Sequence, residues 1–286
     1  MKTIHIIKTE MKKTIMNPGF FLSVIITFLL QFTTQVYVDG LTGKTYSVLE
    51  VLLNLDREIL ESDYSLSSYF IMKSGLAGYF VMFIPILAAF PFIPNFCAER
   101  NSGLIRFTIQ REGKFRYYIT KFLSAILGGG AAVLLGYILF IAIIYCLFPS
   151  IQNYGLSADE ISMVMGKEPV IQGILIFLGV FLYGCVSSVP AFCMASFARN
   201  RYIITCVPFM VVYLYSSGLT KLIYDGIEEN NQRKMDIGNI LKPEQITTLY
   251  YRDTISRYTL FIQLGFVLIA FLLFVCIMNK RKDLGD

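Results

Sequence analysis

The sequence predicts an all-α, polytopic membrane protein, and three observations lead to that fold class. Of its 286 residues, 55% are hydrophobic and only 16% are charged, and its mean hydropathy is +0.60. A soluble domain of this size carries roughly a quarter charged residues. Six uncharged apolar runs each approach or exceed the roughly 20 residues that cross a bilayer. Because backbone polar groups in lipid must pair within their own segment, these runs are expected to be helices.

The expected elements form a single transmembrane domain over residues 1–286. It begins with a helix over residues 1–18 that has apolar side chains on one face and lysines opposite, which is the pattern of an amphipathic helix lying in the membrane interface. The apolar positions are Ile4, Ile7, Met11 and Ile15. A frayed tail is the alternative for this segment. The six predicted spans are residues 20–38, 74–96, 122–148, 170–198, 202–220 and 259–278.

The segments between the spans predict the orientation, because lysine and arginine collect on the cytoplasmic side of membrane proteins. One set holds 15 basic and 5 acidic residues, and the other holds 10 basic and 15 acidic residues. The first set comprises residues 1–19, 97–121, 199–201 and 279–286. The second set comprises residues 39–73, 149–169 and 221–258. Six crossings alternate the two sets, so both termini are expected in the cytoplasm, with residues 39–73 and 221–258 forming outer segments.

Several kinds of chemistry lack the residues that they need. The only histidine is His5, which excludes a histidine-based catalytic triad and an HExxH zinc site within this chain. None of the six cysteines lies in a CxxC pair or an outer loop, so we expect neither a metal site nor disulfides. Gly43-Lys44-Thr45 looks like the end of a phosphate-binding loop, but Val38 stands where its first glycine belongs. We therefore expect no enzyme activity and no cofactor in this chain.

The charge pattern bears on three further classes. Nucleic-acid binding is not expected, because the basic residues flank apolar runs as membrane topology requires. The six runs contain no Asp, Glu, Lys or Arg, which ion-coupled carriers bury along their ion path. A sodium-coupled carrier stays open as an alternative, since backbone carbonyls also bind sodium. A membrane immunity or sensor protein that binds a peptide without transporting it is the other alternative.

The segment after the second run carries the most informative motif. Glu99 and Gly103 form a Glu-x-x-x-Gly pattern, followed by a mixed basic and apolar stretch and then an aromatic entry with Lys121 into the third run. This order resembles the permease subunits of ABC transporters of the type-2 exporter class. The resemblance spans the chain: an amphipathic N-terminal helix, six crossings, a cytosolic loop over residues 97–121, and a long outer segment similar to the family's re-entrant helical pair before the sixth crossing.

The resemblance implies a transport subunit in a bacterial cell membrane. Glu99 and Gly103 match the family's loop, which holds a coupling helix seated in a cleft of a cytosolic ATPase. The implied surface toward that partner is Arg100, Ile105, Arg106, Phe107 and Arg111, with Ile105 and Phe107 as apolar knobs. Two copies of the ATPase would bind ATP and Mg²⁺, and a second permease, identical or related, would complete the pathway in the lipid bilayer. The alternative is a basic loop held at anionic lipid headgroups.

Two more sets of residues follow from the pattern. Without ionisable residues inside the runs, the pathway is expected to be apolar to weakly polar, which favours an amphiphilic or hydrophobic cargo such as an antimicrobial peptide or a drug. The predicted pathway residues are Gln31, Thr34, Gln35 and Tyr37. Two ridges of small residues at steps of four predict close helix packing, within one subunit or between two. They are Gly128, Ala132, Gly136 and Ser187, Ala191, Ala195.

Overall fold

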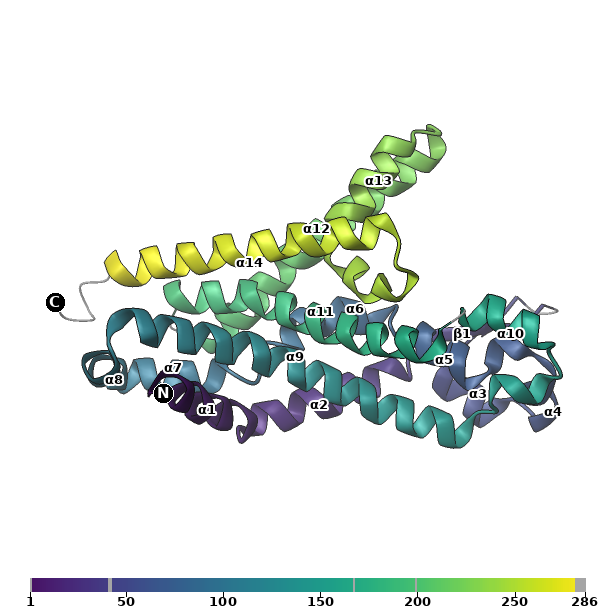
Figure 1. The fold of residues 1–286 in the computed structure, drawn as a ribbon, viewed down its shortest axis with the longest axis horizontal. Coiled ribbons are helices and arrows are strands. Elements are labelled where there is room, and N and C mark those ends of the chain that lie inside the picture. Colours follow the sequence, from purple (N-terminus) through teal and green to yellow (C-terminus); the bar gives the residue numbers. More distant parts are fainter. Residues whose placement is uncertain (1, 41–42, 167, 199, 281–286) are drawn as a thin grey trace.

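The computed structural model describes residues 2–40, 43–166, 168–198 and 200–280, and the predictions for residues 1, 41–42, 167, 199 and 281–286 lie outside them. The described chain is an elongated bundle of helices (Figure 1). Four of its helices are long and apolar enough to cross a membrane, and two bent helix pairs bring the number of candidate spans to at most six. The predicted class, an all-α polytopic membrane protein, is therefore confirmed.

The four long helices contain the last four predicted spans almost completely. They are α9 (Lys114–Leu147), α11 (Pro169–Phe197), α12 (Arg201–Glu228) and α14 (Thr254–Lys280). Two of them are longer than the apolar runs predict. Helix α9 already begins at Lys114, directly after Gly113, which has a positive φ of 88°. Helix α12 continues to Glu228 and ends before Asn230, whose φ of 51° is incompatible with a continued right-handed helix.

The first predicted span is wrong over its second half. Helix α2 (Pro18–Gln31) ends at Gln31, and Gln35–Val38 forms strand β1, which pairs antiparallel with β2 (Thr45–Ser47). The β-branched and aromatic residues of β1 favour an extended chain once the helix has ended. The 14 residues of α2 extend roughly 21 Å at 1.5 Å per residue. That is shorter than the bilayer core of roughly 30 Å, so α2 does not span it alone.

Helix α1 (Lys2–Ile15) precedes α2 and meets it at an angle of 60°. Asn17 caps α2 by accepting a hydrogen bond from the Gly19 N–H, and Pro18 suits the first turn of a helix because its φ is already helical. The expected N-terminal helix is therefore present. It packs beside the first half of α9, at the basic end of the bundle, and its Glu10 and Thr14 are buried.

The second predicted span, residues 74–96, is not one continuous helix. The chain forms α5 (Ser68–Ser74), α6 (Tyr79–Leu87) and α7 (Ile93–Asn101), and α5 and α6 are bent by 56°. Gly78 before α6 has a φ of 65°, a conformation that glycine adopts without strain. Pro91, which cannot donate a backbone hydrogen bond, lies between α6 and α7, and Pro94 stands in the first turn of α7, where the missing N–H has no helical partner. These breaks put irregular backbone beside a cavity described below.

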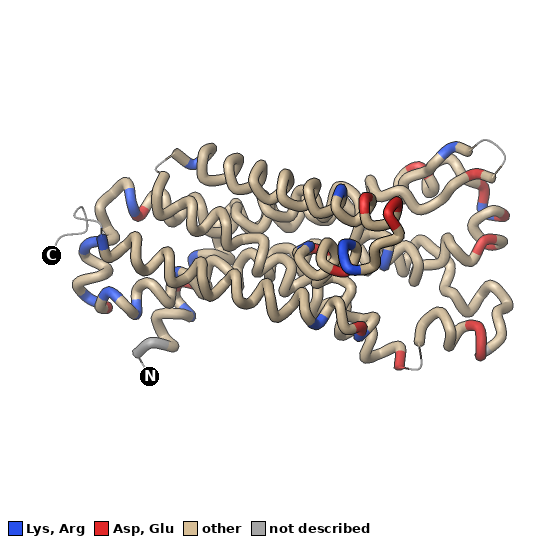
Figure 2. The backbone as a smooth tube through the Cα atoms, turned by 90° about the horizontal axis from the view of Figure 1, so that it is seen from above, with Lys and Arg blue, Asp and Glu red and all other residues tan. Residues whose placement is uncertain are grey.

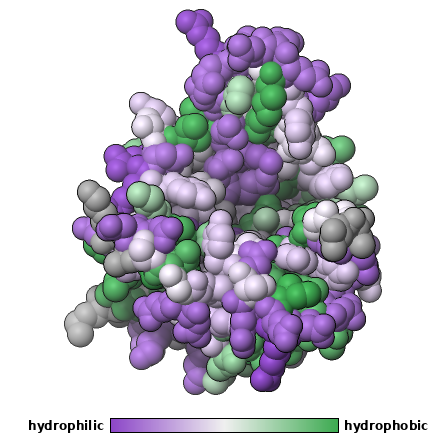
Figure 3. All heavy atoms as spheres, turned by 90° about the vertical axis from the view of Figure 1, so that its right-hand side faces the viewer, coloured by the Kyte–Doolittle hydropathy of each residue, from purple (hydrophilic) through white to green (hydrophobic). Residues whose placement is uncertain are grey.

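Small helices and the β-hairpin form a cap at the end of the bundle opposite α1 (Figure 1). They are β1, β2, α3 (Val48–Asn54), α4 (Arg57–Ser62), the 3₁₀ helices η1 (Tyr64–Leu66) and η2 (Ile151–Tyr154), and α10 (Ala158–Met165). Val48, Val51 and Leu66 are fully buried in one cluster with side chains of α9. Hydrophilic side chains cover much of this end (Figure 3). Residues 43–73 therefore pack as an ordered part of the bundle.

The charge distribution agrees with the expected segregation. Lys and Arg gather at the end that holds α1 and the last turns of α14, whereas Asp and Glu lie mostly toward the other end (Figure 2). The described ends of the chain, Lys2 and Lys280, lie at the same end of the bundle (Figure 1). This basic end is the one for which the sequence predicts a cytoplasmic location.

The segment before α14 folds back along the bundle. Helices α12 and α13 (Gln232–Leu241) form a hairpin that projects from the bundle, and η3 (Pro243–Tyr251) returns to pack against α11 and α14 (Figure 1). A Cβ on Gly179 of α11 would lie 2.7 Å from the carbonyl oxygen of Ile246, so only glycine permits this approach. Ile246 itself is fully buried. This segment carries part of the site described next.

The two ridges of small residues both lie in buried helix contacts. A Cβ on Gly128 would come within 2.4 Å of Thr14 in α1, and one on Gly136 within 2.7 Å of Thr27 in α2. Ala132 is buried between them. The ridge on α9 therefore contacts α1 and α2 of the same chain. Ser187, Ala191 and Ala195 of α11 are likewise buried.

Candidate functional site

A short helix, α8 (Leu104–Glu112), lies at the basic end of the bundle between two glycines. Gly103 has a φ of 72° and Gly113 a φ of 88°, so both turns use backbone conformations that other residues rarely adopt. The sequence Glu-x-x-x-Gly thus ends at the glycine that separates α7 from α8. The two turns set α8 apart from the helices on either side while keeping it attached to both.

The two faces of α8 differ in what they contact. Ile105 and Ile109, four residues apart, are buried against the core formed by α7, α9 and α11. Ile105 is only 3% exposed, whereas Phe107 is 71% exposed. Leu104 is also exposed, and so is Arg111. The prediction that Ile105 and Phe107 both face a partner is therefore wrong for Ile105, because its spacing to Ile109 places it on the inner face of the helix.

Glu99 and Arg100 point into the protein, which for Arg100 corrects its expected place on the surface toward a partner. Oε2 of Glu99 lies 2.5 Å from the Lys121 ammonium, and Oε1 lies 3.8 Å from that of Lys13. Arg100 donates from Nη1 to the backbone carbonyl oxygens of Ala195 and Ala198 at the end of α11. Carbonyls at the C-terminal end of a helix lack intrahelical partners, so a cation is favoured there. Arg106 is exposed on α8.

The pair between Glu99 and Lys121 belongs to a buried ion cluster that the sequence did not reveal. We call Glu10, Lys13, Glu99 and Lys121 the ion cluster. Lys121 from α9 lies between Glu10 of α1 and Glu99 of α7, and the side chains of Lys121, Glu10 and Glu99 are 8%, 9% and 17% exposed. Lys13, at 52% exposed, pairs with Glu10 at 2.7 Å. The cluster therefore joins three helices at the basic end through charges largely removed from water.

A groove of about 430 Å³ separates α1 from α8. Its lining mixes apolar side chains with both signs of charge: His5, Ile6, Thr9, Glu10, Lys13, Leu104, Phe107, Thr108, Arg111 and Glu112. Burial raises the pKa of the Glu112 carboxyl, and the neighbouring Glu10 carboxylate raises it further. The outward side chain Phe107 lies in the wall of this groove. The exposed face of α8 and the groove beside it form one continuous surface, which we call the α8 surface.

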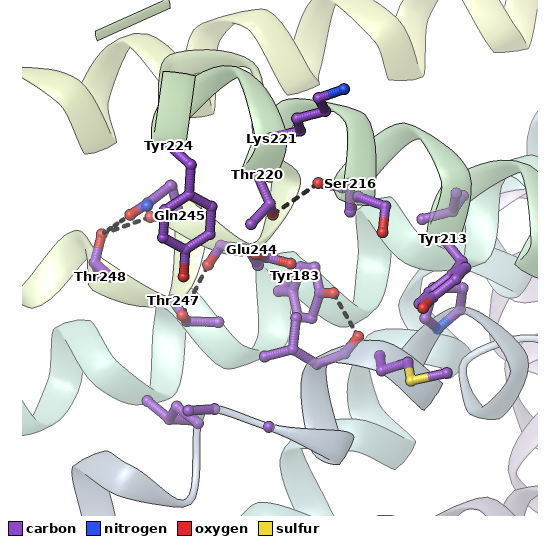
Figure 4. A pocket seen from close by; sticks show the side chains of 18 residues that line it. Tyr183, Tyr213, Ser216, Thr220, Lys221, Tyr224, Glu244, Gln245, Thr247 and Thr248 are labelled. Carbon is purple, nitrogen blue, oxygen red and sulfur yellow. Dashed lines mark hydrogen bonds between the residues drawn. The ribbon is translucent and has the colours of Figure 1, made fainter. Parts of the chain in front are cut away.

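A larger cavity of about 630 Å³ lies between α6, α11, α12 and η3 (Figure 4). Its walls carry three tyrosines, several hydroxyl groups and Glu244, while Leu76, Val81, Met82, Pro85 and Val212 supply apolar area. The other lining residues are Ala77, Gly78, Tyr183, Tyr213, Ser216, Ser217, Thr220, Lys221, Tyr224, Gln245, Thr247 and Thr248. We call this the polar cavity. Its size falls within the range of ordinary ligand sites.

The four predicted pathway residues do not line the cavities and groove described here, and the structure does not gather them at one surface. Gln31 at the end of α2 is fully buried and donates a hydrogen bond to the Thr27 carbonyl oxygen. Thr34 donates to the carbonyl oxygen of Ala77 at 3.5 Å, so it lies one layer behind the polar cavity. Gln35 is exposed on β1, and Tyr37 packs against Tyr46 of β2. They separate because α2 ends at Gln31, while Thr34 follows in a turn and Gln35 and Tyr37 lie on β1.

Comparisons with protein-family models, with curated proteins and with solved structures found no match. Within the described residues, no group of three or more His, Cys, Asp or Glu side chains is placed to hold a metal ion. Two sites described so far combine charged or polar groups with accessible volume: the α8 surface with its ion cluster, and the polar cavity. Hydrogen bonding, charge and shape are what these two sites can use.

Proposed function

We propose that this chain is the membrane-spanning permease subunit of an ATP-driven exporter of the type-2 ABC class, in a bacterial plasma membrane with both termini in the cytoplasm. The observation that carries the proposal is helix α8. It is a short helix between two glycine turns at the basic end of the bundle, anchored by Ile105 and Ile109, and it presents Phe107 outward. Leu104 and Phe107 are exposed together in the wall of the groove, and an aromatic side chain beside a pocket is a common anchor in protein interfaces.

The contacts behind α8 give such a docking site a mechanical consequence. Force applied to α8 reaches α9 directly through Gly113, because α9 begins at the next residue. It reaches α1 and α7 through the ion cluster, whose buried pairs are costly to separate. Helix α9 runs through the bundle to the opposite cap (Figure 1). A partner that closes on ATP would thus move a connected set of helices through one small surface.

The proposal assigns ATP, Mg²⁺ and hydrolysis to two copies of a separate cytosolic ATPase, and only transport to this chain. A second permease, identical or related, would face this one across the bilayer. The cargo would be an amphiphilic or hydrophobic compound. A membrane immunity or sensor protein would have the same helices but bind no ATPase, and a sodium-coupled carrier would transport without one. The presence of a bound ATPase therefore distinguishes the exporter from both alternatives.

The test is to purify the chain from native membranes and identify the proteins that accompany it. The proposal predicts a subunit that carries a phosphate-binding loop and hydrolyses ATP. Phe107→Ala is expected to lose this subunit and the cargo-stimulated hydrolysis. Phe261→Ala is the matched control, because Phe261 is equally exposed at 71% but lies on α14 away from α8. Wild-type chain without an ATPase, or an unchanged complex with Phe107→Ala, would refute the proposal.

A further inference from the structure

A second, apolar cavity of about 340 Å³ lies between α11, α12 and α14. Its lining is Val186, Ser187, Val189, Pro190, Cys193, Tyr215, Pro243, Phe266, Val267, Ile269, Ala270, Leu273 and Gln263, together with Tyr183 and Val212. The largest polar groups among these are already paired. Tyr215 and Gln263 both donate to the carbonyl oxygen of Leu241, at 3.1 and 3.2 Å. What this cavity offers a ligand is therefore apolar surface.

The polar and the apolar cavity adjoin each other. Tyr183 of α11 and Val212 of α12 line both, so the same two side chains form the boundary between them. The Tyr183 hydroxyl donates to the carbonyl oxygen of Val81 in α6 at 2.9 Å, which fixes the ring at that boundary (Figure 4). A molecule that occupies both cavities would thus meet hydrogen-bonding groups at one end and hydrocarbon at the other.

The polar cavity has unused hydrogen-bonding capacity. The hydroxyls of Thr220, Thr247 and Thr248 donate hydrogen bonds to backbone carbonyl oxygens of their own segments (Figure 4). By contrast, the side-chain hydroxyls of Tyr213, Tyr224, Ser216 and Ser217 make no hydrogen bond within the described residues. Lining hydroxyls of this kind can serve a ligand as donors or acceptors. Polar groups placed in an otherwise apolar pocket set the orientation of what binds there.

The polar cavity offers a cation its tyrosine rings and one carboxylate oxygen of Glu244, whose other oxygen, Oε1, pairs with Lys242. Glu244 is the one acidic residue in its lining and interacts electrostatically with Tyr183. The ammonium of Lys221 points away from the other lining side chains (Figure 4), so Lys221 contributes mainly its aliphatic stem. Lys242, which pairs with Glu244, is outside the lining. Tyrosine rings attract an alkylammonium group through their negative faces.

From these contacts we infer that the two adjoining cavities bind one cationic amphiphile, with its ammonium group near Glu244 and the tyrosines of the polar cavity and its alkyl chain between α11, α12 and α14. This inference rests on the proposed function only in naming the ligand as cargo. It places the cargo inside one subunit rather than at residues 31–37. The boundary at Tyr183 and Val212 would separate headgroup from chain.

The experiment uses the full chain alone in lipid nanodiscs, without any ATPase. A dodecyltrimethylammonium derivative with a photoreactive diazirine in its alkyl chain is cross-linked to the protein, and the labelled residues are mapped by mass spectrometry. We expect labels on the residues that line the apolar cavity. Unlabelled dodecyltrimethylammonium should prevent this labelling, and dodecyl sulfate at the same concentration should not.

Two variants with matched controls test the two ends of the ligand. Glu244→Gln should weaken competition by dodecyltrimethylammonium about tenfold, the effect of losing the Coulomb attraction between one carboxylate and the quaternary ammonium. Glu228→Gln on the exposed end of α12 should leave it unchanged. Ala270→Phe should fill the apolar cavity and abolish its labelling. Leu268→Phe, at a position on α14 that is exposed and outside the lining, should not.

Three outcomes would overturn the inference. Labels spread evenly over the exposed faces of α12 and α14 would show contact from the bilayer only. Equal competition by dodecyl sulfate would show that the polar cavity does not distinguish a cationic from an anionic headgroup. Labelling that survives Ala270→Phe would place the alkyl chain elsewhere. Because the assay contains no ATPase, these outcomes leave the proposed coupling through α8 untouched, and failure of that coupling leaves this binding test valid.

Discussion

Removing the ammonium of Lys121 is the most informative perturbation of the ion cluster. Lys121→Met keeps the length of the side chain but leaves the carboxylates of Glu10 and Glu99 with Lys13 as their remaining partner in the cluster. Lys13 is about half exposed, so water screens much of its attraction. The two carboxylates would then be buried with too little positive charge near them. We expect α1, α7 and α9 to separate more readily at the basic end.

The burial of the cluster sets the size of the expected effect. Breaking a buried ion pair by removing one partner costs about 3–5 kcal/mol. Lys13→Met removes an exposed partner and should cost less than about 1 kcal/mol. Replacing all three buried members by neutral side chains, as in Glu10→Gln, Glu99→Gln and Lys121→Met together, should recover most of the loss, because no buried charge then remains unpaired.

Cys97 provides the assay. It is buried in α7, two residues before Glu99, and becomes reactive only when this region opens. With the other cysteines replaced by alanine, the rate of Cys97 modification by a thiol reagent in detergent reports the population of the open state. A loss of about 3 kcal/mol corresponds to a rate increase of roughly a hundredfold. Equal rates for Lys121→Met and Lys13→Met, or no recovery in the triple variant, would refute the structural role of the cluster.

Three other predictions follow from the same contacts. Ile105→Ala should lower the stability of the folded chain by about 2–5 kcal/mol, whereas Phe107→Ala should change it by less than about 0.5 kcal/mol, as measured by thermal unfolding; similar losses would contradict the two-faced character of α8. Gly136→Val should prevent the close approach of α9 to Thr27 and lower the yield of folded protein, while Gly173→Val, where a Cβ meets nothing within 4 Å, should not; equal yields would count against this packing. Burial and Glu10 raise the pKa of Glu112, which disfavours its ionised form in the folded state. Glu112→Gln should therefore raise the thermal midpoint at neutral pH; the gain should shrink as the pH falls through the raised pKa of Glu112 in the folded chain and vanish below the ordinary pKa of a glutamate in the unfolded chain, and a gain that persists in acid would contradict this cause.

The long helices could be predicted because their apolar runs are uninterrupted. In α11 and α14 in particular, the apolar run makes up most of the helix. The end of α2 could not, since Thr33 and Thr34 are as compatible with a buried helix as with the strand that follows. Gly78 and the prolines at 91 and 94 gave a signal for the breaks around α6, but proline also kinks membrane helices without ending them. Whether the chain breaks or only kinks around α6 depended on how α5 packs under the cap.

The candidate site was predictable in its location and less so in its side chains. Ile105 and Ile109 are four residues apart, so their common inner face could have been recognised from spacing alone. The ion cluster could not, because Lys121 and Glu10 are separated by 111 positions and meet only after α1 has folded along α9. The polar cavity likewise depends on η3 returning to α11, which places Glu244 beside Tyr183 (Figure 4).

The central claim is that the outward face of α8 lies in the cytoplasm and contacts an ATP-hydrolysing subunit. A photoreactive amino acid at position 107, activated in intact cells, tests this contact directly, with the same amino acid at position 261 as the control. We expect a cross-link from position 107 to a protein with a phosphate-binding loop, and no cross-link to that protein from position 261. A cysteine at position 107 that reacts with a membrane-impermeant thiol reagent outside intact cells would contradict it.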